Sequence, residues 1–232
     1  MPKELGSTSR STRDGKTIAQ SFVSFFEGWL VRQEHYLDEL LSVQQHCHES
    51  TEEDLKELVS RILSHYEQYY EEKSRLVQGN VFLVFSPPWF SSLEQSFFWI
   101  AGFKPSLAFR VLSNSVNDLS EDQNSEVGRL EKETKVNERL LADEFAKIQE
   151  SLASPPLLQE ARLQGRAGED GRVSDRLAVG SLRSRLEAVV AKADLLRTNT
   201  VVKVMEILNS VQKVNFLTAV TRLQLRIRNM EY

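Results

Sequence analysis

Apolar residues recur every three or four positions over most of the chain, and this spacing predicts amphipathic helices. A first helix is expected over residues 17–46, and a second follows to about residue 77 after Ser50 and Thr51, which suit a helix start. No window shows sustained alternation of the kind that a β-strand needs. We therefore predict an all-α, multi-helix bundle, with its later helices over residues 104–112, 120–152, 182–211 and 214–229.

The segment of residues 80–112 is the richest in aromatic side chains, with seven of the twelve Phe and two of the three Trp. Pro87 and Pro88 predict an extended stretch before a short helix that begins at Ser91 or Ser92 and continues to Ala101. So much aromatic surface at helical spacing predicts an aromatic-rich core. The alternative is an apolar cavity between helices that accepts a lipid tail.

Polar segments set the predicted domain organisation. Residues 1–16 lack an apolar stretch and predict a disordered polar tail, and residues 17–232 then form a single helical domain. Residues 153–175 contain two prolines and three glycines with weak periodicity. They predict one long, mobile loop within that domain.

The charge is unevenly distributed. The whole chain has a net charge of −4, but residues 17–171 carry 14 Lys or Arg against 26 Asp or Glu, a net charge of −12, whereas residues 172–232 carry a net charge of +6. An acidic body disfavours non-specific phosphate binding, which needs clustered Lys and Arg. We expect the basic end to pair with the acidic body inside the fold, with an acidic partner as the alternative.

Single residues point to few sites of chemistry. His46, Cys47 and His48 are the one cluster that resembles a metal ligand set, but neighbours on a helix point about 100° apart, so we predict no metal site. A nucleophile elbow and a glycine-rich phosphate loop are both absent from the sequence. Gln33 lies on the apolar stripe of the first helix and predicts a polar core residue bonded to another helix, rather than a functional site. We expect no enzyme and no obligatory cofactor.

The last predicted helix is basic and amphipathic. Arg222, Arg226 and Arg228 lie near its end and define a candidate partner-binding face. The alternative is a terminal helix that packs its apolar side on the bundle and leaves its arginines in water. The single cysteine, the absence of an apolar leader and the absence of a run of about 18 apolar residues favour an intracellular protein without a membrane span.

Five stretches together resemble the plant Delay-of-Germination (DOG) domain, which also forms the C-terminal region of TGA-type bZIP transcription factors. The likeness covers nearly the whole chain after residue 17, in the order of the family. The stretches are Trp29, Leu30 and Gln33; residues 62–67 (ILSHYE); Asn80, Val81 and Phe82 with Trp89; residues 98–106 (FWIAGFKPS); and Ala193, Asp194, Leu196, Arg197 and Thr200, leading into Ile207 and Leu208.

The resemblance implies a stand-alone Delay-of-Germination-like protein, a regulator of seed dormancy, seed maturation and abscisic-acid-linked transcription. Only about 16 residues precede the domain, without the basic helix and zipper of a bZIP factor, which argues against direct DNA binding. Implied partners are bZIP factors, signalling phosphatases or co-regulators, in a homo- or heterodimer, in the nucleus or cytoplasm. The alternative is a DNA-associated regulator that works through heteromers with bZIP factors.

In TGA-type relatives the domain looks able to bind a fatty-acyl chain among its helices, and the resemblance implies the same here. The matching aromatic positions define a candidate apolar ligand pocket at Phe82, Trp89, Phe98, Trp99 and Phe103. Two further alternatives follow from the same resemblance: a sensor of lipid or haem, and a membrane-domain marker like a pollen-aperture factor that carries this domain. The absence of a lipidation signal weighs against the marker.

Overall fold

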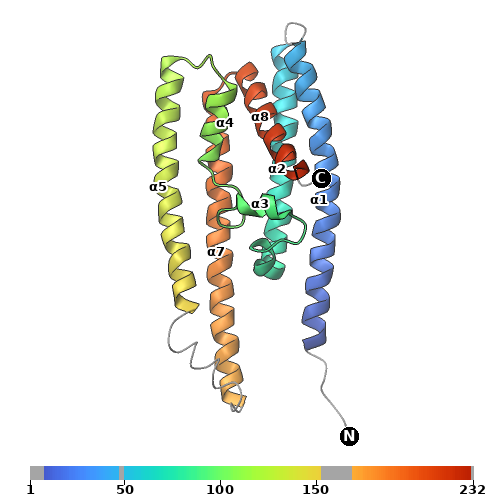
Figure 1. The fold of residues 1–232 in the computed structure, drawn as a ribbon, viewed down its shortest axis with the longest axis vertical. Helices are drawn as coiled ribbons and strands as arrows, with labels where there is room; N and C mark the ends of the chain where they lie inside the picture. Colours follow the sequence, from blue (N-terminus) through green and yellow to red (C-terminus); the bar gives the residue numbers. More distant parts are fainter. Residues whose placement is uncertain (1–7, 47–49, 153–168, 231–232) are drawn as a thin grey trace.

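Two antiparallel helical hairpins form the frame of the molecule (Figure 1). The structure is a computed structural model that describes residues 8–46, 50–152 and 169–230. Helices α1 (Thr8–Gln45) and α2 (Glu52–Asn80) make one hairpin, and α5 (Glu121–Leu152) and α7 (Glu169–Ile207) make the other. Within the described ranges the only β-type pairing is an isolated bridge between Phe98 and Phe103, so the all-α prediction is confirmed.

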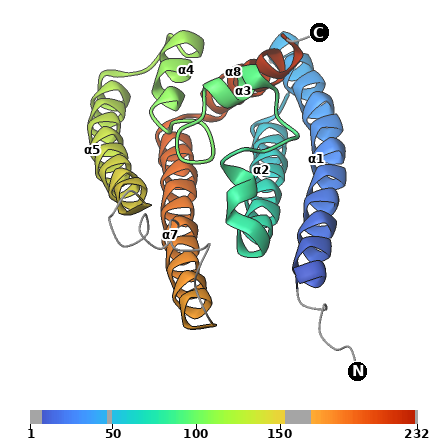
Figure 2. The ribbon, with the colours of Figure 1, turned by 60° about the horizontal axis from the view of Figure 1, so that its bottom comes forward.

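Shorter elements fill the space between the hairpins, as Figure 2 shows from a second direction. The 3₁₀ helix η1 (Val81–Val84) continues directly from α2, and α3 (Ser92–Ser96) and α4 (Leu107–Ser115) follow in the aromatic segment. Helix α8 (Ser210–Asn229) crosses the bundle and contacts α1, α2, α3 and α4. Since α8 packs on α1 and α2, and Gln123 of α5 donates to Gln212 of α8, this helix connects the two hairpins.

Capping boxes begin three of these helices. Thr51 caps α2 through Asp54, Ser91 caps α3 through Glu94, and Asn209 caps α8 through Gln212, each side chain accepting from the N3 backbone N–H. The caps at Thr51 and Ser91 are where the sequence predicts helix starts. The cap at Asn209 lies five residues before the predicted start of the last helix, because the apolar stripe runs on through this break.

The core consists of two hydrophobic clusters. The first joins the middle of α1, the end of α2, η1, the second half of α5 and the middle of α7, around Phe22, Phe26 and Trp29. The second joins the end of α1, the start of α2, α4 and the end of α7 with α8, around Phe109 and Phe216. Tyr66 packs against both clusters, and the aromatic-rich core is confirmed.

Several predicted boundaries change. Helix α1 begins at Thr8, so residues 8–16 of the predicted polar tail are helical, and residues 1–7 lie outside the described residues. Helix α7 begins at Glu169, so the end of the predicted loop is helical, and residues 153–168 also lie outside the described residues. On α5, the helical spacing of the apolar residues Val136 and Leu140 would favour a packed position, but 56% and 61% of their surfaces are exposed.

Candidate functional site

The most unusual backbone in the described residues is a tight turn between Phe98 and Phe103. The Trp99 backbone N–H donates to the Gly102 carbonyl at 2.6 Å, and the two central residues, Ile100 and Ala101, have φ values of 44° and 58°. Such a turn normally takes Asn and Gly, because a side chain with Cβ is strained there. Each such residue costs about 1–3 kcal/mol and persists only when its surroundings hold it.

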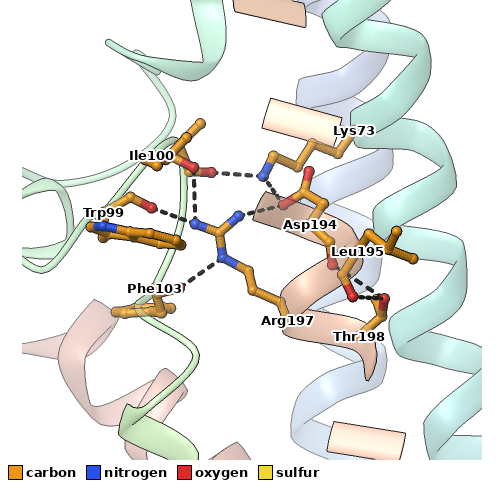
Figure 3. Close-up of polar contacts among 9 residues, drawn as sticks. Lys73, Trp99, Ile100, Phe103, Asp194, Leu195, Arg197 and Thr198 are labelled. Atoms are coloured by element: carbon orange, nitrogen blue, oxygen red, sulfur yellow. Dashed lines mark hydrogen bonds and ion pairs between the residues drawn. The ribbon is translucent and has the colours of Figure 1, made fainter. Parts of the chain in front are cut away.

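Arg197 of α7 places its guanidinium beside this turn and donates to three of its carbonyls (Figure 3). Its Nε donates to the Phe103 carbonyl at 2.7 Å, and its Nη2 donates to the carbonyls of Ile100, at 2.9 Å, and Trp99. The guanidinium also lies 5.5 Å from the centre of the Trp99 ring. A Cβ on Gly102 would approach Arg197 Cζ to 3.0 Å, so glycine lets the backbone come this close.

Lys73 and Asp194 complete the arrangement, which we call the Arg197 clamp: Lys73, Asp194 and Arg197. Lys73 Nζ donates to the Ala101 carbonyl and to Asp194 Oδ1, both at 2.7 Å, and Arg197 Nη1 donates to the same Oδ1 at 2.6 Å. Burial lowers the pKa of Lys73 to about 8, against the attraction of Asp194. The predicted helix continues to Ala101, but the observed helix α3 ends at Ser96. Beyond it, the clamp supplies the hydrogen bonds to backbone carbonyls that a longer helix would have made.

The clamp brings together two of the five stretches that carry the family resemblance, residues 98–106 and the stretch around Asp194 and Arg197. The sequence alone did not identify Lys73 as their third member. The position of Lys73 could have indicated its role. It continues the apolar stripe of Ile62, Tyr66 and Tyr69 on α2, where a charged side chain is unusual. A lysine on such a stripe, 3% exposed in the structure, needs a buried partner.

An apolar cavity of about 250 Å³ lies beside the clamp, between α2, α4, α7 and α8. Phe103 and Arg197 belong to its wall, so the turn and the cavity share residues. Exposed Glu67 and Lys104 also line it. The cavity is the part of the site that could hold another molecule.

The five aromatic residues proposed for an acyl chain do not surround one cavity. Phe103 lines the cavity beside the clamp, whereas Trp89 and Trp99 pack against the first hydrophobic cluster. Phe98 stands between the rings of Phe90 and Phe103, with ring centroids 5.0 and 5.8 Å away, and Phe82 is 46% exposed. These residues are close in sequence, but they lie in different places: a cavity wall, a hydrophobic cluster, a stack of rings and the exposed surface.

The three arginines of the proposed basic face also separate. Arg222 and Arg226 are exposed, whereas Arg228 Nη1 donates to the Trp89 carbonyl at 3.2 Å and lies 3.3 Å from Glu94 Oε2. Lys192 with Glu144 and Lys203 with Glu133 add two more pairs between the basic end and the acidic body. The expected internal pairing is therefore present, and Arg222 and Arg226 are what remains for a partner.

Gln33 is fully buried and confirms its predicted place in the core. Its Nε2 donates to Tyr66 Oη at 2.6 Å and to Gln224 Oε1 at 3.1 Å, and Tyr66 Oη donates to the same Gln224 oxygen at 2.9 Å. This network joins α1, α2 and α8 at the point where the two hydrophobic clusters meet.

Other predicted sites can be placed in part. His46 Nδ1 lies 3.0 Å from the Ser42 carbonyl, and Cys47 and His48 fall outside the described residues. Among the residues with described positions, no three His, Cys, Asp or Glu side chains gather as a metal site would require. Of the helices in those same ranges, none combines the length and the apolar character needed to cross a membrane.

Comparison with known proteins adds relatives over the whole fold. The DOG1 family model, described as seed dormancy control, matches residues 36–114. Protein RESPONSE TO ABA AND SALT 1 of Arabidopsis thaliana is 37% identical over 220 residues, which cover 92% of this chain and 96% of that protein. Protein ZW2 of Arabidopsis thaliana is 37% identical over 91% of this chain and 96% of that protein. Transcription factor TGA2.3 of Oryza sativa subsp. japonica is 29% identical over 90% of this chain and 63% of that protein.

Proposed function

Because the chain belongs to the DOG1 seed-dormancy-control family, we propose that it is a non-enzymatic regulator of abscisic-acid and salt responses that acts by binding other proteins. The observation that carries this proposal is the 37% identity to Protein RESPONSE TO ABA AND SALT 1, which extends over nearly the full length of both chains. Seed dormancy and maturation are the processes in which we expect it to act, in the nucleus or cytoplasm.

The structure suggests how such a protein would work. The polar side chains of the Arg197 clamp bond to each other and to backbone carbonyls, so they shape the fold instead of facing a substrate. The exposed surface of the helices then remains for partners. Arg222 and Arg226, near the end of α8, offer positive charge to an acidic surface of a phosphatase, co-regulator or second DOG domain.

A second candidate function is regulation of DNA-bound complexes through heteromers with bZIP factors. It is favoured by the match to transcription factor TGA2.3, which covers 90% of this chain and shows that the same domain occurs in a transcription factor. In such a heteromer the DNA contacts would come from the bZIP partner, and this chain would contribute its helical domain.

The test is purification of the tagged protein from maturing seeds, with and without abscisic acid, followed by mass spectrometry of the proteins that accompany it. Recovery of bZIP factors would favour the second function, and recovery of phosphatases without them would favour a signalling adaptor. The double variant Arg222→Glu and Arg226→Glu should lose the specific partner. A matched control, Arg139→Glu and Lys147→Glu on exposed α5 positions, should keep it. Equal recovery by both variants would contradict the role of α8.

A further inference from the structure

The cavity beside the Arg197 clamp has walls, size and polarity suited to a small ligand. We propose that it binds a compact, mostly apolar ring compound that carries one hydrogen-bond acceptor. This site involves different residues from the five aromatic positions considered above, and of those it includes only Phe103. The proposal concerns ligand binding and does not depend on which proteins the chain contacts.

The size of the cavity favours a compact molecule. A dry engineered cavity of about 150 Å³ binds benzene, so a volume of 250 Å³ accommodates a somewhat larger molecule, such as two fused rings. Drug-sized ligands use pockets of about 300–1,000 Å³. A long acyl chain would have to leave much of its length outside, whereas a bicyclic compound matches the volume of the cavity.

Most of the lining is apolar, although Glu67, Lys104 and Arg197 also belong to it. Leu107 and Val111 come from α4, Val201 from α7, and Leu217 and Val220 from α8. A ring compound that fills this space gains contacts and removes apolar surface from water, at roughly 25 cal/mol per Å². Charged ligands would lose hydration here without a buried partner, because Arg197 already donates to three carbonyls and Asp194.

One polar side chain on the wall keeps a donor without a protein partner in the described residues. Gln224 lines the cavity, and its Oε1 accepts from Gln33 Nε2 and Tyr66 Oη. These two bonds fix the amide so that its carbonyl side faces the core. Its Nε2 donates to no other residue in the described part of the chain, so this N–H group is left for a carbonyl or hydroxyl oxygen of the ligand.

The cavity is also held open in advance. Phe103 belongs to the turn whose carbonyls Arg197 and Lys73 hold, and Pro105 follows it as a buried wall residue. The Gln33 network fixes the opposite side through Tyr66 and Gln224. A preformed site does not have to be ordered by the ligand, which favours binding of small molecules.

Two probes distinguish the contribution of the hydrogen-bond acceptor from that of the apolar rings. They are 1-tetralone, a fused bicycle with one carbonyl, and tetralin, the same bicycle without the carbonyl. Titration of the full chain by ligand-observed NMR should show both binding, with 1-tetralone tighter by about 5- to 10-fold, the value of one hydrogen bond. Decanoate serves as the extended acyl competitor. Decanoate that binds tighter than 1-tetralone and displaces it would overturn the compact-ring proposal.

Variants locate the site. Ala108→Leu places a larger side chain in the cavity wall and should weaken 1-tetralone at least 10-fold, while Val136→Leu, on the exposed side of α5, should leave it unchanged. Gln224→Glu keeps an acceptor for Gln33 and Tyr66 but removes the donor, so the preference for 1-tetralone over tetralin should disappear. Thermal melting checks that each variant is folded. Unchanged binding in folded Ala108→Leu, or an unchanged preference in folded Gln224→Glu, would overturn the proposal whatever partners are found in seeds.

Discussion

Two sets of charge pairs connect α7 to the rest of the molecule, one buried and one exposed. In the Arg197 clamp the side chains of Lys73, Asp194 and Arg197 are 4%, 17% and 6% exposed. Lys192 with Glu144 and Lys203 with Glu133 join α7 to α5, and these four side chains are 39–55% exposed. The same charges therefore have different consequences: the buried set holds a strained backbone in place, whereas the exposed set is screened by water.

The largest expected effect comes from Arg197→Met. It removes the donors to three carbonyls of the turn and leaves Asp194 with Lys73 alone, so we expect a loss of about 3–5 kcal/mol in the free energy of unfolding, measured by urea denaturation. Should this variant fail to fold, Arg197→Lys, which retains the charge without the fork, should fold with an intermediate loss. A loss below about 1 kcal/mol in either variant would contradict the role of the clamp.

His65 is a buried titratable side chain that, unlike the members of the Arg197 clamp, has no ion-pair partner in the described part of the chain. It is 2% exposed, stacks on Trp29 with ring centroids 4.4 Å apart, and its Nε2 has no hydrogen-bond partner in the described residues. Burial, helped by nearby Arg32, lowers the pKa of His65 from 6.5 to about 4. Between these values only the unfolded chain binds the proton, so stability should rise as pH increases from about 4 to 6.5 and be fully present above that range.

We expect His65 to raise the free energy of unfolding by about 2 kcal/mol over this pH range. This is somewhat less than the full pKa shift would give, because some solvent screening remains. His65→Phe keeps a ring against Trp29 and removes the titration, so its stability should be flatter across pH 4–6.5, as measured by urea denaturation at several pH values. His35→Phe, on an exposed position of α1, is the control. An unchanged slope in His65→Phe would show that His65 is not the group that titrates.

The smallest expected effect is that of Lys203→Gln. It breaks the exposed pair with Glu133, and we expect a loss below about 1 kcal/mol that disappears in about 1 M salt. Urea denaturation in low and high salt measures it. A loss as large as that of Arg197→Met would remove the distinction between the buried and exposed pairs.

Local signals predicted much of the fold. The 3.6-residue period and the caps at Thr51 and Ser91 placed α2, α3 and α5 close to their observed starts, because these signals act within one turn of helix. The same period placed Gln33 correctly in the core. Helix α8 begins earlier than predicted, since the apolar stripe does not change at the Asn209 cap and periodicity alone cannot mark the break.

The turn of residues 98–103 could not be read from sequence. A primed turn is usually signalled by Asn and Gly, but here Ile100 and Ala101 occupy it, and helix-forming residues precede it. Its shape depends on Lys73 and Arg197, which lie far away along the chain. The cavity was missed for the same reason, because its wall comes from four helices. By contrast, the resemblance had already singled out residues 98–106 and the stretch around Arg197, although it did not show that they touch.

The turn of residues 98–103 and the Arg197 clamp lie far apart along the chain, and this separation affects folding during translation. Arg197 lies 94 residues after Phe103, and Asp194 lies 121 residues after Lys73. At about 5–20 residues per second, a ribosome needs roughly 5–20 s to add the residues that close the turn. During that time the aromatic segment has no complete α7 to pack against. A transcript that ends before codon 197 would therefore yield an aggregation-prone fragment, which chaperones or proteases would have to remove.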